Sequence, residues 1–246
     1  MRRARLILLA GTVLYSAWMI APLLGSRLSP LTSYVSEAGA VGQPNALFFR
    51  AADLLAGTAF VVAGALCHLA LRPVPKLGLV ALAGLFILGI ATMCDALMPL
   101  SCTPTADAAC AAREAARQVP LTHVGHAVSS GIAGFGGVVA VLGWGLWRRS
   151  TGTGFDGARL LLGMGVTYLL ATTWTLAAML EPALYLGLAQ RTQVLSLTLW
   201  LVLLATAPRP RGRRPEGRHP AGRDTSRSPR PPATTAGPSR PDRPDG

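Results

Sequence analysis

Two histidines and an aspartate are the side chains best suited to chemistry. His123 and His126 lie at the start of one apolar segment, and Asp95 lies near the end of the preceding one. A spacing of three residues puts both imidazoles on one face of a helix, with Cβ atoms about 5–6 Å apart. Two imidazoles and a carboxylate suit zinc, which activates water when one coordination position stays open. The alternative is a hydrogen-bonded cluster in which Asp95 holds one ring, and the more specific HExxH motif is absent from the sequence.

Further polar residues extend this candidate set. Arg191 offers a fixed positive charge for a carboxylate or an anionic headgroup, or else it is an ordinary interfacial arginine. Arg50 and Asp53, three residues apart, are expected to pair locally. Glu37 or Glu181 is the candidate proton acceptor if the site is catalytic. The residues predicted to bind a ligand are Ser36, Glu37, Asp95, His123, His126 and Arg191.

Long apolar segments must position these side chains. Apolar residues make up 51% of the 246-residue chain and charged residues only 14%, and the mean hydropathy is +0.42, which is unusual for a soluble domain. We predict an all-α integral membrane protein, with a six-helix transmembrane domain over residues 1–207. The last segment is the shortest, because its uninterrupted apolar run begins at Val194. The predicted helices are 6–24, 47–71, 77–100, 121–147, 159–180 and 190–207.

The basic residues predict an orientation. Arginine and lysine gather before the first segment, after the second, after the fourth and after the sixth, and such residues are retained on the cytoplasmic side. Both termini are therefore expected in the cytoplasm, with connections 25–46 and 101–120 outside the cell membrane. The first segment is longer than a typical signal core and is expected to remain as an anchor. This threading gathers eight ionisable residues in one outward-facing polar pocket: Glu37, Arg50, Asp53, Asp95, His123, His126, Glu181 and Arg191.

The last part of the chain, residues 208–246, has a different composition. It holds ten prolines, ten arginines and four acidic residues, so it contributes a net charge of +6 to the chain's +12. A segment with so little to bury is predicted to be a disordered cytoplasmic tail that enforces topology or contacts anionic headgroups. It lacks aromatic residues for stacking and any recognition motif, so nucleic acid is not an expected partner.

The four cysteines divide by position. Cys67 and Cys94 lie within apolar segments, where a free cysteine behaves as a small apolar residue. Cys102 and Cys110 share the second outer connection, with seven residues between them. The outside is an oxidising compartment, so we predict a disulfide, the alternative being two free thiols.

The sequence resembles a family of bacterial multi-pass membrane proteins known as domain-of-unknown-function family 998. The resemblance covers roughly residues 6–207 and implies six membrane helices. One position departs from the pattern, because related sequences read Gly-Leu-x-Glu-Arg where this chain has Gln190. The motifs that carry the resemblance are SxxSExGA from Ser33 to Ala40, Pro44 followed by LFFRAADLLAG, the set Asp95, Pro99, His123 and His126, and GLxxR from Gly187 to Arg191.

The first outer connection is also similar to that of eukaryotic damage-regulated autophagy modulator type membrane proteins, a group associated with lipid organisation. Our hypothesis is a pocket that binds a lipid or another envelope-associated small molecule, with Arg50 and Arg191 receiving an anionic group. One alternative is a metal-dependent intramembrane hydrolase, with zinc held by His123, His126 and Asp95. Another is a proton-coupled carrier. Such a carrier needs a proton route to the cytoplasm, and the cytoplasmic half of the predicted bundle offers only His68 for it.

Overall fold

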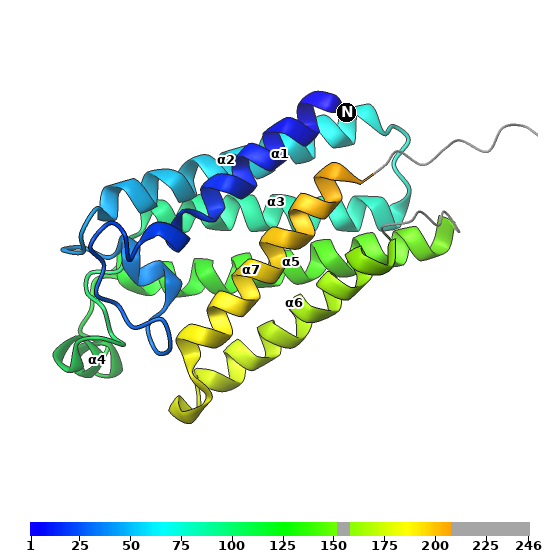
Figure 1. Cartoon of the computed structure of the whole chain (residues 1–246). Helices are drawn as coiled ribbons and strands as arrows, with labels where there is room; N and C mark the ends of the chain where they lie inside the picture. Colours follow the sequence, from blue (N-terminus) through cyan, green and yellow to red (C-terminus); the bar gives the residue numbers. More distant parts are fainter. Residues whose placement is uncertain (152–157, 208–246) are drawn as a thin grey trace, which may run out of the picture. The chain divides into compact units, whose positions relative to one another are not determined.

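The computed structural model describes residues 1–151 and 158–207, and all regular secondary structure within these residues is helical. Six helices of these ranges are long and apolar enough to cross a membrane, the first of them together with its 3₁₀ extension. The protein is therefore an all-α, multi-pass membrane protein, as predicted (Figure 1). The α-helices are α1 (Arg2–Tyr15), α2 (Ala46–Ala70), α3 (Lys76–Leu97), α4 (Ala108–Ala115), α5 (Leu121–Thr151), α6 (Ala158–Ala178) and α7 (Leu186–Thr206), and the 3₁₀ turns are η1 (Ala17–Ile20), η2 (Val35–Gly39) and η3 (Pro182–Leu184).

Helix α3 packs between α2 and α5, while α1 packs against α2. Helix α7 packs against α6 and crosses to reach α1 (Figure 1). Helices α5 and α6, by contrast, touch at few points. The short helix α4 lies in the connection before α5, at one end of the bundle, which we call the α4 end.

Glycines allow α3 to approach both of its neighbours closely. A Cβ atom on Gly84 of α3 would collide with the backbone of Ala140 on α5. A Cβ atom on Gly89 would lie 2.7 Å from the carbonyl oxygen of Gly57 on α2. Since lipid supplies no hydrophobic force between helices, such close backbone contact is a main source of their attraction.

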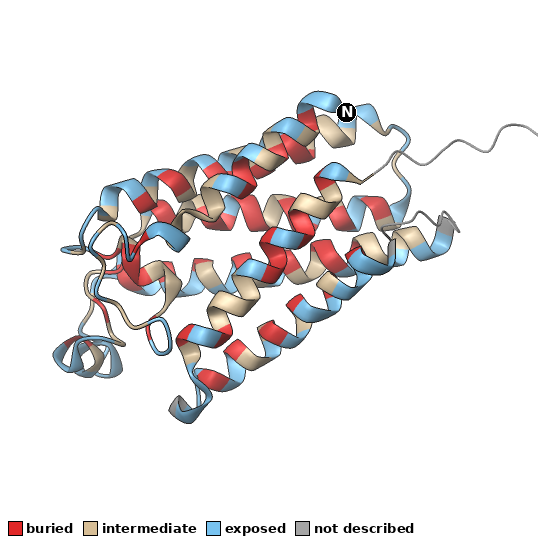
Figure 2. Ribbon diagram, in the orientation of Figure 1, coloured by how far each residue is buried: buried red, intermediate tan, exposed pale blue. Residues whose placement is uncertain are grey.

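Large apolar side chains are exposed on the faces that the helices turn away from one another. Val13 of α1 is 72% exposed, and Leu170 of α6 is 67% exposed. Figure 2 shows buried residues where helices face each other and exposed ones along the outward faces. These outward faces are matched to acyl chains, as a spanning bundle requires.

Several helix boundaries differ from the predicted ones. Helix α1 ends at Tyr15 and continues only as η1 to Ile20, short of residue 24. Helix α3 ends at Leu97, because Pro99 disfavours a helical conformation at the residue before it. Helix α7 begins at Leu186, four residues before the predicted start, and its 21 residues are long enough to span. Helix α4 was not predicted, and the proposed tail, 208–246, lies outside the described residues.

Candidate functional site at the α4 end

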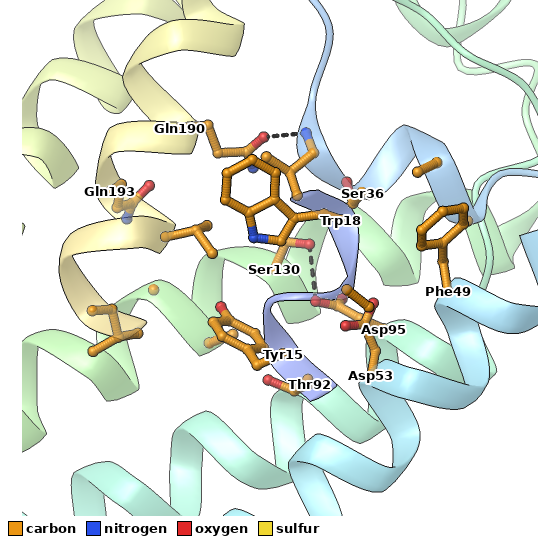
Figure 3. Close-up of a pocket in the computed structure, with 18 of the residues that line it drawn as sticks. Tyr15, Trp18, Ser36, Phe49, Asp53, Thr92, Asp95, Ser130, Gln190 and Gln193 are labelled. Carbon is orange, nitrogen blue, oxygen red and sulfur yellow. Dashed lines mark hydrogen bonds between the residues drawn. The ribbon is translucent and has the colours of Figure 1, made fainter. Parts of the chain in front are cut away.

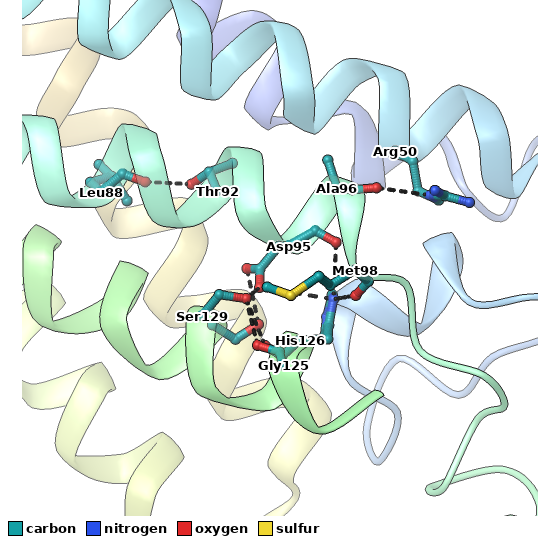
Figure 4. A network of polar contacts seen from close by, with 10 residues as sticks. Arg50, Leu88, Thr92, Asp95, Ala96, Met98, Gly125, His126 and Ser129 are labelled. Carbon is teal, nitrogen blue, oxygen red and sulfur yellow. Dashed lines mark hydrogen bonds and ion pairs between the residues drawn. The ribbon is translucent and has the colours of Figure 1, made fainter. Parts of the chain in front are cut away.

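Asp95, near the C-terminal end of α3, is the most connected of the predicted site residues. The Ser130 hydroxyl donates to its Oδ2 at 3.0 Å, and the Ser129 hydroxyl donates to its Oδ1. His126 Nδ1 lies 3.8 Å from the same Oδ1 (Figure 4). All three partners belong to α5, so the Asp95 carboxylate joins α3 to α5.

His126 caps the end of α3. Its Nδ1 lies 3.2 Å from the carbonyl oxygen of Asp95 and 3.1 Å from that of Met98, so the tautomer with a proton on Nδ1 donates to carbonyls that have no partner within the helix. Arg50 does the same from α2, where its Nε donates to the Ala96 carbonyl at 2.9 Å (Figure 4). Arg50 is therefore not paired with Asp53, and the predicted local pair of these two residues is wrong. The Nε2 atom of His126 is buried, and no atom in the described part of the chain forms a hydrogen bond with it.

His123 faces a different part of the molecule. The Ser101 backbone N–H donates to His123 Nδ1 at 3.1 Å, and the Ser101 hydroxyl lies 3.0 Å from the same atom. The opposite nitrogen, Nε2, points towards Glu114 of α4, with 3.6 Å to Oε1. His123 thus anchors the connection that carries α4.

The predicted zinc ligands do not meet at a common point. His123 turns to Ser101 and Glu114, whereas His126 turns to the carbonyls at the end of α3. Across 1–151 and 158–207, no group of three or more His, Cys, Asp or Glu side chains is placed to hold a metal ion. The described geometry therefore does not bring His123, His126 and Asp95 together as one ligand set.

Glu37 is completely buried where the two outer connections meet. Its Oε1 accepts the Thr105 backbone N–H at 2.8 Å, and the Thr105 hydroxyl donates to Oε2. Burial raises the pKa of this carboxyl above its ordinary value, and hydrogen bonds from Thr105, Ser33 and Tyr34 offset part of the rise. Glu37 does not line either of the cavities described below. Its hydrogen bonds with Thr105 instead hold the first outer connection to the second.

Arg191 is also occupied by backbone. Its Nη1 donates to the carbonyl oxygens of Pro30 at 3.0 Å, Ser33 at 2.7 Å and Gly187 at 3.0 Å. The guanidinium therefore holds the first outer connection against α7. Glu181 remains exposed, and among the described residues its carboxylate accepts only the local backbone N–H of residue 183, at 3.2 Å.

A cavity of about 110 Å³ lies inside the bundle at the α4 end. Figure 3 shows Asp53 and Asp95 reaching it from α2 and α3, with the Trp18 ring across from them. The indole Nε1 of Trp18 is buried and has no hydrogen-bond partner among the described residues. The polar and aromatic residues of its wall are Tyr15, Trp18, Ser36, Phe49, Asp53, Thr92, Asp95, Ser130, Tyr168, Gln190 and Gln193.

A larger groove of about 420 Å³ opens between α5, α6 and α7. Its wall is mostly apolar, and it includes side chains that are strongly exposed, such as Phe135 at 61% and Leu176 at 60%. Tyr34, Glu114 and His126 lie at its polar end. The sparse contact between α5 and α6 leaves room for this groove.

The residues of the two cavities were only partly identified from the sequence. Ser36, Asp95 and His126 were predicted, whereas Trp18, Ser130 and Gln193 were not. Ser130 follows His126 by one helical turn, a spacing that places both on one face of α5 and offered a usable signal. Trp18 and Gln193 reach the cavity from helices distant in sequence, and no local pattern reveals them.

Comparison with known proteins places the whole bundle in one family. No curated protein and no solved structure matches the chain. The family described as "Protein of unknown function (DUF998)" matches residues 8–207, which is more than half of the chain and includes all or most of each predicted membrane helix. The chain belongs to this family of proteins of unknown function.

Proposed function

We propose that this protein binds a lipid at the α4 end of its bundle. The observation that supports the proposal is that the interior cavity and the groove share lining residues but differ in polarity. The interior cavity is bordered by carboxyl, hydroxyl and amide groups as well as by apolar and aromatic side chains, whereas the groove is mostly apolar. A chamber that holds several polar groups, beside a mostly apolar groove, matches an amphiphile with a headgroup and an acyl chain. Five residues line both cavities: Ser36, Ser130, Gly134, Gln190 and Gln193.

The groove is placed to receive an acyl chain from the bilayer. Phe135 and Leu176 face outward from α5 and α6, and Met179, also in the groove wall, is 56% exposed. An acyl chain that enters the groove leaves one apolar surrounding for another, so hydrophobic burial contributes little to affinity. Selective binding then depends on van der Waals fit in the groove and on the polar contacts of the headgroup.

The α4 end is proposed to face outside the plasma membrane. More of the basic residues flank the opposite end of the bundle than the α4 end, as expected for a cytoplasmic side. The α4 end also carries Cys102 and Cys110, whose sulfur atoms are joined and whose Cα atoms are 6.0 Å apart. A disulfide here agrees with an oxidising compartment. The lipid would therefore come from the outer leaflet.

A photoactivatable phospholipid with a diazirine in its acyl chain tests the proposal. The full-length protein is reconstituted with this lipid, irradiated, and digested for mass spectrometry. We expect adducts concentrated on the groove walls of α5 and α6. Replacement Gly131→Leu fills the groove, because Gly131 lines it and a Cβ atom there meets nothing within 4 Å. The matched control is Gly145→Leu on the same helix, where the space beside the Cβ position is equally open.

The expected result is loss of groove adducts in Gly131→Leu and their retention in Gly145→Leu. A fall of about tenfold corresponds to roughly 1.4 kcal/mol of lost binding. Adducts spread evenly over all outward faces, and unchanged by Gly131→Leu, would overturn the proposal.

A further inference from the structure

The interior cavity holds two acidic side chains and no basic one. Asp53 comes from α2 and Asp95 from α3, and Figure 3 shows the two carboxyl groups next to each other in the same wall. No lysine, arginine or histidine is among the described residues that line this cavity. Arg50 and Arg191, which were expected to receive an anionic group, donate to backbone carbonyls instead.

The two carboxyl groups differ in how they are satisfied. Asp95 accepts hydrogen bonds from Ser129 and Ser130 and lies beside His126. Asp53 has neither a hydrogen bond nor an ion pair with any described residue. It lies seven residues inside α2, about 10 Å from the first residue of that helix at 1.5 Å per residue. A carboxylate at that depth is costly unless it binds a proton or a positive group lies next to it.

A second polar group on the same cavity also lacks a partner. Trp18 Nε1 is a donor, it is buried, and nothing in the described protein accepts its proton. One wall thus offers an acceptor without a donor, and another offers a donor without an acceptor. A ligand with a positive group and a nearby oxygen satisfies both at once.

Aromatic rings complete the lining. Tyr15, Trp18, Phe49 and Tyr168 all border the cavity. Organic ammonium groups are attracted to the faces of such rings, Trp most strongly, and this attraction grows when water is excluded. A volume of about 110 Å³ is several times what one water molecule needs, which suits a short aminoalkyl group.

We infer that the cavity binds the ammonium group of an amphiphile between Asp53 and Asp95, with Trp18 donating to an oxygen of the same headgroup. A phospholipid with an ethanolamine headgroup has this chemistry, because its ammonium lies two carbons from a phosphate ester. The inference rests on the proposed lipid binding, since it assigns the headgroup of the lipid whose chain occupies the groove.

Competition between two lipids with identical acyl chains tests the headgroup assignment. The full-length protein is equilibrated with equimolar phosphatidylethanolamine and phosphatidylglycerol and examined by native mass spectrometry. We expect phosphatidylethanolamine to be retained about tenfold more, as for a hydrogen-bonded charged group. Asp53→Asn should bring the ratio near one. Glu181→Gln, which removes an exposed acidic group at the same end, should leave the ratio unchanged.

Two further variants keep the test decisive. If Asp53→Asn does not fold, Trp18→Phe keeps an aromatic ring but removes the N–H, and it should lower the ratio severalfold. Gly131→Leu should reduce retention of both lipids equally. Lipid retention that Gly131→Leu does not change would contradict the proposed lipid binding itself. Groove binding that persists with no headgroup preference would contradict only the assignment of the cavity to the headgroup of this lipid.

Binding of small cations shows whether the positive group comes from a lipid headgroup, a soluble amine or an inorganic ion. Methylammonium alone, titrated into delipidated protein, should bind saturably, and Asp53→Asn should abolish the binding. Methylammonium binding without any preference between the two lipids would support the ammonium site and assign it to a soluble amine. Sodium binding without methylammonium binding would overturn the inference, because an inorganic ion would then be the ligand.

Discussion

Gln190 Oε1 accepts a hydrogen bond from the Val35 backbone N–H at 2.7 Å. The bond ties the start of α7 to the turn η2, at the edge of the interior cavity (Figure 3). The family resemblance leads one to expect glutamate at this position. A glutamate offers the same acceptor oxygen, so glutamine preserves the contact and omits the charge.

Replacing Gln190 separates the contact from the charge. We expect Gln190→Leu to lower the free energy of unfolding by about 1–3 kcal/mol, because the Val35 N–H loses its acceptor. Gln190→Glu should retain the native stability at neutral pH. Thermal unfolding in mild detergent measures both variants. Equal losses in the two would mean that the acceptor oxygen is not what stabilises this junction.

Glu37 gives a pH dependence of known sign. Its pKa is raised in the folded protein by burial, so the folded state binds the proton more tightly than the unfolded state. The stability contributed by the protonated form is fully present below the unfolded pKa, ~4.3, and is lost as the pH rises through the raised folded value. Relative to Glu37→Gln, the native protein should therefore lose stability over this range.

Unfolding of both proteins across pH 4–8 measures this difference. The control is Glu181→Gln, whose side chain is exposed. If the native protein instead gained stability relative to Glu37→Gln as the pH rose, burial of Glu37 would not be the cause of the pH dependence.

The Cys102–Cys110 pair gives a test of topology. We expect a membrane-impermeant maleimide to label these cysteines on intact cells only after reduction, in a chain whose Cys67 and Cys94 are replaced by serine. Reduction should also lower the free energy of unfolding by roughly 2–3 kcal/mol, since the bridge closes a short loop. Labelling without a reductant would show free thiols, and labelling only after permeabilisation would reverse the orientation.

The contact between α3 and α5 should be the least tolerant of added volume. Gly84→Ala places a methyl group against the backbone of Ala140, which cannot rotate aside as a side chain can. We expect a loss of about 1–3 kcal/mol in the free energy of unfolding. Gly163→Ala on α6 meets nothing within 4 Å and should be nearly neutral. Similar stabilities for the two variants would show that α3 and α5 are less tightly packed.

The number and type of the membrane helices could be predicted because hydrophobicity is a local property. Six apolar runs of about 20 residues are enough to indicate six spans, whatever their packing. Their ends were less predictable. Pro99 ends α3 early, and α7 starts before its apolar run, because its first turn is held by contacts with the first outer connection.

The candidate site shows where sequence reasoning stops. The sequence alone determined that Asp95, His123 and His126 gather at one end, since helix length and alternating direction place them there. It gave no means to decide their partners. Asp95 and His126 lie beside each other, but His123 turns away, because each ring is oriented by backbone groups supplied from distant segments.

Only the tertiary structure decided which charges remain available. Arg50 and Arg191, expected to receive an anionic ligand, are bound to carbonyls, while Asp53 is left without a partner beside Asp95. The physical reason is that a charged side chain in an apolar interior takes whichever partner the packing brings near. That partner depends on contacts between residues far apart in sequence, which residue type and spacing do not specify.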